Sequence, residues 1–155
     1  MHIEERSSRF SYGQEFVLLL PSNPQIIEDA VAVLVRRCEQ FAFGGSRLYW
    51  NFRVGVSEAL TNAVLHGNRG DPGKEVRVEV RLDDSRVALK VIDQGNGFDP
   101  STVPDPTLPD NLERTGGRGV FIMCEMMDEV EFIDPGNAVR LVLRREPPPP
   151  PAPGE

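Results

Sequence analysis

The sequence predicts an α/β domain in which helices accompany an antiparallel sheet. Hydrophobic and charged residues alternate over residues 74–84, which is typical of a strand with one buried face and one exposed face. The apolar segments 129–134 and 138–146 flank the turn sequence Asp-Pro-Gly-Asn and indicate a hairpin. Apolar residues recur at helical spacing in 21–43 and 46–66, which we therefore expect to be helices.

The first half of the chain divides into one strand and these two helices. The apolar run 15–21 predicts a short strand that ends in proline. In the first helix, Pro24 suits the first helical position, and the glycines at 44–45 end the helix. We expect the first helix to bury Ile27, Val31, Leu34 and Val35, and the second to bury Phe52, Val56, Ala59, Leu60 and Ala63.

The second half begins with a loop at 67–73, which leads into the strand 74–84. The chain then turns at 83–85 into a further strand over 86–93. The segment 119–128 predicts a third helix before the hairpin, and its methionines are expected to pack in the core: Met123, Met126 and Met127.

Composition limits the class of protein. A chain of 155 residues can form one domain with a full core, and its net charge of -7 disfavours nucleic acid as a direct partner. No apolar run approaches the roughly 20 residues that span a bilayer, and no signal peptide is recognisable. We therefore expect a cytoplasmic protein without membrane contact, with Cys38 and Cys124 reduced near its core. The proline-rich residues 147–155 are expected to form a disordered tail.

The second predicted helix carries three polar residues at intervals of four: Glu58, Asn62 and His66. Because a step of four residues advances an α-helix by only about 40°, the three side chains share one face. This face is either exposed to solvent or lines a pocket.

Two glycine-containing motifs follow this helix. Asp93 opens the sequence Asp-Gln-Gly-Asn-Gly, whose spaced glycines let the backbone pass close to a flat ligand while the carboxylate accepts a hydrogen bond. The segment 115–123 predicts a glycine-rich loop before a helix, where exposed N–H groups attract anions such as phosphate. Taken alone, the first motif also suits an ordinary surface turn, and the second also suits a capped loop.

The order of the three motifs resembles the ATP-binding domain shared by DNA gyrase, the heat-shock chaperone ATPase, histidine kinases and the mismatch-repair ATPase (the GHKL superfamily). Within it, the chain is most similar to the serine-protein kinases that act as bacterial anti-sigma factors in sporulation and general stress. The resemblance covers residues 12–146 and rests on SEALTNAVLHGN, DQGNGFDP, PDPTLPDNLERTGGRGVFIM and MMDEVEF. It implies one kinase domain of the Bergerat type, a two-layer α/β sandwich with a mixed, mainly antiparallel sheet and helices on one face.

The resemblance also implies roles for single residues. Glu58 matches the family's general base, which would deprotonate the Ser or Thr hydroxyl of a protein substrate. Asn62 matches the asparagine whose amide oxygen helps to hold Mg²⁺. Asp93 matches the residue that accepts the exocyclic N–H of adenine. The matching glycines are Gly95 and Gly97 beneath the base, and Gly117 and Gly119 in the phosphate loop.

Several other residues have two possible roles. Arg114, Thr115 and Arg118 either reach the β- and γ-phosphates of ATP or are exposed to solvent. His66 either contacts the phosphates or the lid, or it closes the C-terminus of its helix. The segment 98–117 would form the lid. The GGRG sequence at 116–119 carries one residue more than the corresponding segment of some sporulation-type members. The register of the phosphate contacts therefore stays open.

Three functions remain open. The first is an ATP-dependent serine/threonine protein kinase that acts as an anti-sigma factor or a similar partner-switching regulator and phosphorylates a small antagonist protein. The second is a non-catalytic ATP-sensing module. The third, the catalytic fragment of a histidine kinase, is disfavoured because the chain has only two histidines. The presence of both Glu58 and Asn62 favours the first. The resemblance further implies ATP and Mg²⁺ as cofactors, an antagonist protein or sigma factor as partner, and a homodimer.

Overall fold

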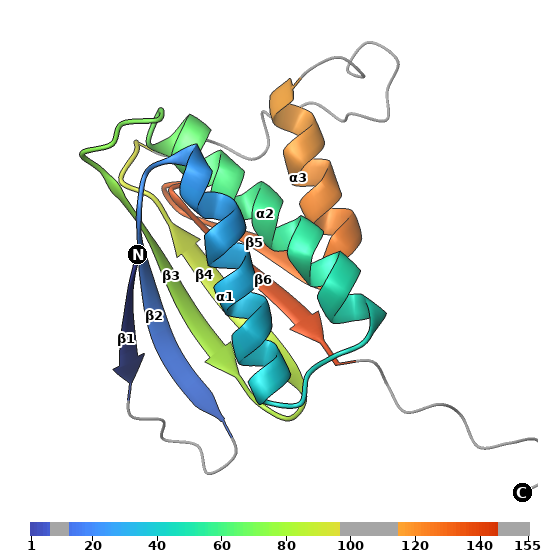
Figure 1. The fold of residues 1–155 in the computed structure, drawn as a ribbon. Helices are drawn as coiled ribbons and strands as arrows, with labels where there is room; N and C mark the ends of the chain where they lie inside the picture. The colour runs from blue at the N-terminus through green and yellow to red at the C-terminus, as the bar shows by residue number, and fades with distance from the viewer. Residues whose placement is uncertain (7–12, 97–114, 146–155) are drawn as a thin grey trace, which may run out of the picture.

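A computed structural model describes residues 1–6, 13–96 and 115–145 of the chain (Figure 1). One sheet contains the strands β1 (His2–Arg6), β2 (Gln14–Pro21), β3 (Glu75–Leu82), β4 (Arg86–Ile92), β5 (Glu129–Ile133) and β6 (Ala138–Arg144). Its strand order is β1-β2-β3-β4-β6-β5, and the neighbouring strands in this order pair antiparallel. The helical segments are η1 (Pro24–Ile26), α1 (Ile27–Gln40), η2 (Arg47–Phe52), α2 (Arg53–Thr61), η3 (Asn62–Gly67) and α3 (Thr115–Met126).

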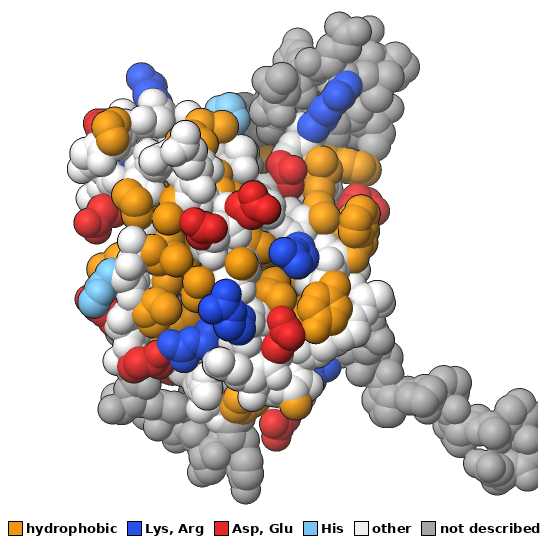
Figure 2. All heavy atoms as spheres, viewed as in Figure 1, with side chains coloured by type: hydrophobic (Ala, Val, Ile, Leu, Met, Phe, Trp, Pro, Cys, Tyr) orange, Lys and Arg blue, Asp and Glu red, His pale blue; other side chains and the backbone are white. Residues whose placement is uncertain are grey.

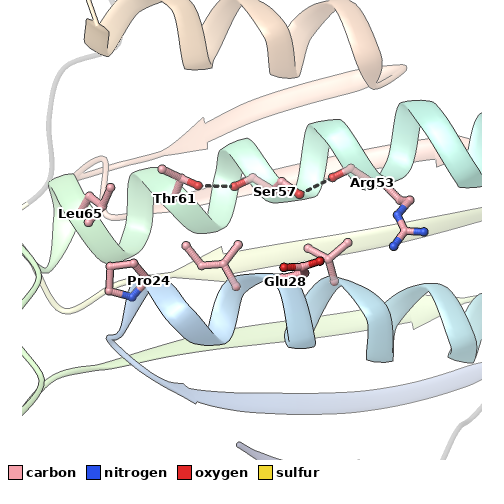
Figure 3. Close-up of a pocket in the computed structure, with 8 residues that line it drawn as sticks. Pro24, Glu28, Arg53, Ser57, Thr61 and Leu65 are labelled. Carbon is pink, nitrogen blue, oxygen red and sulfur yellow. Dashed lines mark hydrogen bonds between the residues drawn. The ribbon is translucent and has the colours of Figure 1, made fainter.

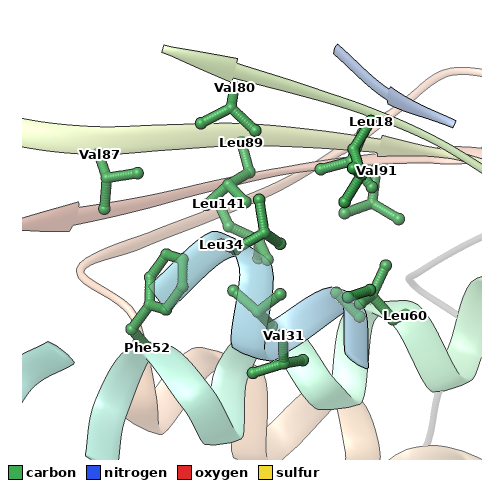
Figure 4. Packing of buried hydrophobic residues seen from close by; sticks show 14 of the residues in the cluster. Leu18, Val31, Leu34, Phe52, Leu60, Val80, Val87, Leu89, Val91 and Leu141 are labelled. Carbon is green, nitrogen blue, oxygen red and sulfur yellow. The ribbon is translucent and has the colours of Figure 1, made fainter. Parts of the chain in front are cut away.

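The helices cover one face of the sheet, with α2 between α1 and α3 (Figure 1). The alternation of hydrophobic and charged residues predicted in β3 determines which of its side chains face the helices. Val78 pairs with Leu18 of β2 and with Val91 of β4, and all three side chains are buried. All three belong to the core cluster that also contains apolar residues of the helices, and Figure 4 shows Leu18 and Val91 facing those helices. The predicted two-layer α/β sandwich is therefore confirmed.

The second predicted helix is observed as one continuous helical stretch. It comprises η2, α2 and η3, and both of its ends have the wide turns of a π-helix. All of the side chains predicted to be buried in it are buried. In α1 the predicted stripe is buried as well, except that Ile27 is only partly buried. Apolar periodicity was thus sufficient to place both helices.

The third helix begins earlier than the sequence predicts. Residues 115–118, which we expected to form a glycine-rich loop, are already helical in α3. Glycine in a helix costs about 1 kcal/mol relative to alanine, so local propensity alone disfavours this start. The helix α3 packs against α2, and tertiary packing supplies most helical stability in proteins.

The prediction for the two cysteines is only half correct. Cys38 is buried, and burial raises the pKa of its thiol to about 12, so this thiol is unreactive at neutral pH. Cys124 is exposed on α3 and does not lie in the core. Of the predicted methionines, Met123 and Met127 are buried and Met126 is half-buried. Within the described residues, no helix is long and apolar enough to cross a bilayer.

The edge strand β1 was not predicted. Its sequence, His-Ile-Glu-Glu-Arg, offers a single apolar side chain, Ile3, so it has no hydrophobic alternation to recognise. The strand forms because β2 presents a free edge to which it can pair along its whole length, from His2 opposite Leu19 to Arg6 opposite Glu15.

Candidate functional site

The second helix carries a first group of predicted site residues where it meets α3. Glu58 in α2 and Asn62 at the start of η3 are half-buried and stand one turn apart. A Cβ atom placed on Gly119 of α3 would lie 3.0 Å from Glu58 Oε2 and 3.3 Å from Asn62 Oδ1. The two helices approach so closely here that a side chain at position 119 would press on both polar groups.

The C-terminal end of the same helix meets the loop after β4 in a second group. The Gly95 N–H donates a hydrogen bond of 2.7 Å to Asp93 Oδ1. A Cβ atom on Gly67 would collide with the Asp93 carboxylate, and one on Gly95 would collide with the Gly67 carbonyl oxygen. Only glycine allows the end of η3 and the Asp93 loop to come this close.

Two asparagines hold the backbone around Asp93. The Asp93 N–H donates to the Asn137 carbonyl oxygen at 2.9 Å, and Asn137 Nδ2 donates to the Asp93 carbonyl oxygen at 3.3 Å. On the other side, the Gln94 N–H donates to Asn68 Oδ1 at 2.7 Å. The sequence did not predict that Asn137, Asn68 and Gly67 belong to this site. Their segments were expected to be turns and loops, and no local pattern shows that these residues meet Asp93.

The environment of Asp93 suits it to accept a hydrogen bond from a ligand. Burial raises the pKa of Asp93 above the usual aspartate value, and the Gly95 N–H and the Lys74 charge offset only part of that effect. A half-buried carboxylate that is ionised gains from any further donor, and a ligand N–H would be one. The backbones of Gly67 and Gly95 come close to this carboxylate.

Asn62 could contribute one ligand to a magnesium ion, but a site there would need further oxygens. In the part of the chain that the structure describes, no three His, Cys, Asp or Glu side chains gather in a way that could hold a metal. Magnesium commonly takes one or two protein oxygens together with substrate phosphates and water. The Asn62 amide oxygen therefore fits a magnesium ion that arrives together with a nucleotide.

The comparison with known families decides which nucleotide-binding class the chain represents. The histidine kinase-like ATPase domain matches residues 20–143, a range that contains both groups of site residues. The chain belongs to this family. The predicted GHKL-type ATPase domain is thereby confirmed.

Proteins similar to this histidine kinase-like ATPase domain are named as anti-sigma factors and serine-protein kinases. The anti-sigma F factor of Bacillus cytotoxicus is 43% identical over 81 residues, which span 50% of this chain and 55% of that protein. The serine-protein kinase RsbW of Listeria innocua is 27% identical over 132 residues, which span 81% of this chain and 83% of that protein. The crystal structure of the RsbU and RsbW domains of Rv1364c from Mycobacterium tuberculosis has the same fold. It matches with a TM-score of 0.59 at 18% identity, over 84% of this chain and 32% of the other.

The remaining predicted residues of the ATPase site are only partly placed. His66 lies exposed in the last turn of η3, where its position suits the negative end of the helix dipole. Arg118 is exposed in α3. Thr115 and Gly117 lie in the first turn of that helix. Gly97, Arg114 and the lid segment up to residue 114 lie outside the described residues, so their predicted contacts remain predictions.

A separate groove lies between α1 and α2, on the flank of α2 that faces away from α3 (Figure 3). The groove has a volume of about 480 Å³ and is lined by Pro24, Ile27, Glu28, Val31, Arg53, Ser57, Thr61 and Leu65. The hydroxyls of Ser57 and Thr61 donate to the carbonyl oxygens one turn earlier, at 2.6 and 2.7 Å. None of the predicted site residues lines this groove, so it is distinct from the ATPase site.

Proposed function

We propose that this histidine kinase-like ATPase domain is an ATP-dependent serine/threonine protein kinase that acts as an anti-sigma factor or a similar partner-switching regulator. Its substrate would be a Ser or Thr of a small antagonist protein. The main observation is the pairing of Glu58 and Asn62 against Gly119, on the same helix whose end meets Asp93. The names of the similar proteins support the same function.

In this proposal, the Asp93 end of the site recognises the base of ATP. The carboxylate of Asp93 would accept a hydrogen bond from the exocyclic N–H of adenine. Its orientation is already fixed by the Gly95 N–H. The base would lie against the backbone of the glycine-containing loop, where a larger residue could not fit.

At the other end, Glu58 and Asn62 would carry out the chemistry. Asn62 would turn its amide oxygen toward the magnesium ion, which neutralises phosphate charge when bound. Glu58 would accept the proton of the substrate hydroxyl as that oxygen forms its bond to the γ-phosphorus. The bond between the γ-phosphorus and the β,γ-bridging oxygen breaks, and ADP leaves. The N-terminus of α3, in which Gly117 lies, would stabilise the phosphate charge through its N–H groups.

The character of the surface supports a protein partner. Acidic and basic side chains are interspersed with hydrophobic ones over the helical face, without a broad basic region (Figure 2). Such a mixed surface, on a chain of net charge -7, suits a protein better than a phosphate backbone. We further propose that residues 12–146 form the kinase domain, that 147–155 lie outside it, and that the protein is a cytoplasmic homodimer.

A phosphotransfer assay with labelled ATP and candidate antagonist proteins tests the proposed function. Glu58→Ala should lower the rate of transfer by about 10²–10⁴-fold and leave the affinity for ATP within about threefold, because a general base acts only in the chemical step. Glu125→Ala, which removes an exposed glutamate from the last turn of α3, is the matched control and should transfer phosphate normally. ATP binding without transfer to any antagonist would favour the non-catalytic sensing module instead.

A further inference from the structure

Asn68 is an uncharged polar side chain that is wholly buried at the point where the second helix ends. Its exposed fraction is 0%, although it follows a helix terminus and precedes an exposed loop. A buried amide is stable only when its donor and acceptor groups are both used. The positions of its partners therefore show what the residue does.

The side chain of Asn68 takes part in a closed ring of three hydrogen bonds. Asn68 Nδ2 donates to the Glu75 carbonyl oxygen at 3.0 Å, and the Glu75 N–H donates to Gln94 Oε1 at 2.7 Å. The Gln94 N–H completes the ring by donating to Asn68 Oδ1 at 2.7 Å. The ring joins the end of η3, the start of β3 and the loop after β4.

The ring requires an asparagine at this position. One side of the Asn68 amide faces a carbonyl oxygen and must donate, whereas the other side faces an N–H group and must accept. An ionised aspartate would direct a second oxygen at the Glu75 carbonyl, and an apolar residue would leave two part-buried backbone groups without this partner. The main chain of Asn68 is fixed as well, because its N–H donates to the Ala63 carbonyl oxygen at 2.8 Å.

The hydrogen bond to the Gln94 N–H places this ring directly beside Asp93. The peptide group between Asp93 and Gln94 is held at its nitrogen by Asn68 and at its carbonyl oxygen by Asn137. With this peptide fixed, the Asp93 side chain has little freedom, since its carboxylate also accepts from the Gly95 N–H. Asn68 thus helps to fix the peptide group that follows the Asp93 side chain.

We propose that Asn68 is a positioning residue that sets the preference of the site for adenine over other purines, by orienting Asp93 toward the exocyclic N–H of the base. The inference rests on the proposed function, in which Asp93 is the adenine acceptor. A purely structural role would make Asn68 important for folding only. The positioning role makes Asn68 important for discrimination between adenine and other purine bases.

The test compares ATP with purine riboside triphosphate, which keeps the triphosphate and lacks the exocyclic amine. Calorimetry would give the dissociation constants of both for each variant. Wild type should prefer ATP by about 10- to 150-fold, the value of one hydrogen bond to a charged group. In Asn68→Ala this preference should shrink at least about fivefold, while the affinity for purine riboside triphosphate stays within about threefold.

Asn51→Ala is the matched control for loss of a partly buried amide. Asn51 Nδ2 donates to the Met126 carbonyl oxygen at 2.9 Å, near the opposite end of the second helix from Asn68. This variant should lower the melting temperature and leave the preference for ATP unchanged. An unchanged preference in Asn68→Ala, with or without a lower melting temperature, would overturn the positioning role.

Gln94→Ala keeps the inference testable if Asn68→Ala does not fold. Gln94 is exposed, so the variant should fold, yet it removes the acceptor of the Glu75 N–H and opens the ring. The preference for ATP should fall by about two- to fivefold, and no fall would count against the inference. A wild type that binds both nucleotides equally would refute the proposed role of Asp93 alone, whereas one that binds neither would refute the proposed function itself.

Discussion

The two ends of the candidate site are built in different ways. At the Asp93 end, hydrogen bonds from Asn137 and to Asn68 fix the backbone, and the neighbouring segment is another backbone. At the Glu58 end, Gly119 approaches from a different helix, and the groups that a Cβ atom there would meet are tips of side chains. Side chains can move by tenths of an ångström, whereas a bonded backbone cannot do so without breaking contacts. The two ends should therefore respond differently to the same substitution.

The largest effect is expected from adding one methyl group at the rigid end. In Gly95→Ala the new Cβ atom would collide with the Gly67 carbonyl oxygen, and only a shift of the backbone could relieve that collision. Overpacking of this kind costs about 3 kcal/mol or more, so ATP affinity should fall by at least roughly 100-fold. Calorimetric titration would measure the change. A loss of less than tenfold would show that the Asp93 loop is not rigid.

The next largest effect concerns the charge of Asp93. Asp93→Asn replaces an acceptor by a group that also donates, and it should remove most of the preference for ATP over purine riboside triphosphate, about 10- to 150-fold. Only this preference should fall, because the substitution adds no bulk. Equal preferences in Asp93→Asn and wild type would exclude Asp93 from base recognition.

The same carboxylate should make the preference depend on pH. Burial raises the pKa of Asp93 in the folded protein, and the ionised form is the better acceptor. The preference for ATP should therefore be complete above this raised pKa and decline as the pH falls through it. Comparing the two nucleotides at each pH cancels the titration of their phosphates. Asp93→Asn should give a flat profile over the same range.

A smaller effect is expected when the same methyl group is added at the other end. In Gly119→Ala the new Cβ atom would lie 3.0 Å from Glu58 Oε2, a contact that a slight movement of the side chain can relieve. ATP affinity should stay within about threefold, but phosphotransfer should slow by roughly tenfold because Glu58 is displaced from its position. Equal losses of ATP affinity in Gly119→Ala and Gly95→Ala would show that the two ends of the site do not differ in rigidity.

No change in binding is expected from Asp128→Ala, which tests whether stability alone affects the site. Asp128 accepts hydrogen bonds from Arg47 Nη2 at 2.5 Å and from the Arg144 N–H at 2.6 Å. Burial alone would raise the pKa of Asp128, but these hydrogen bonds and the arginine charges outweigh it and lower the pKa. The ionised carboxylate should therefore stabilise the fold by about 1–2 kcal/mol, given its partial exposure.

The pH dependence of the stabilisation by Asp128 can be tested as well. Because the pKa of Asp128 is lower in the folded state, its stabilising effect is present above the unfolded value near 3.9 and is lost as the pH falls through the folded value. Urea unfolding at neutral pH should show a less stable Asp128→Ala variant, and the difference from wild type should vanish in acid. Asp84→Ala, at an exposed aspartate, should match wild type at both pH values.

Sequence alone predicted much of this fold, because hydrophobic periodicity specifies elements that bury one face. The valines of β3 and the stripe of the second helix are examples. The roles of Glu58, Asn62 and Asp93 came from the family resemblance and remain predictions. Contacts between distant segments were not predictable. The ring formed by Asn68, Glu75 and Gln94 joins residues that are ordinary loop or strand positions when read locally. The helical start of α3 was not predicted either, since the glycines in its sequence favour a loop.

The position of β6 has a consequence for how the protein is made. This strand comes last along the described chain, yet it lies inside the sheet and pairs with both β4 and β5. During synthesis the ribosome has therefore released almost the whole domain before β4 and β5 can be joined. Until then, the edge of β4 is unpaired and the Asp93 loop lacks its hydrogen bonds with Asn137. A growing chain should thus complete the candidate site abruptly, once β6 has left the ribosome, and not gradually.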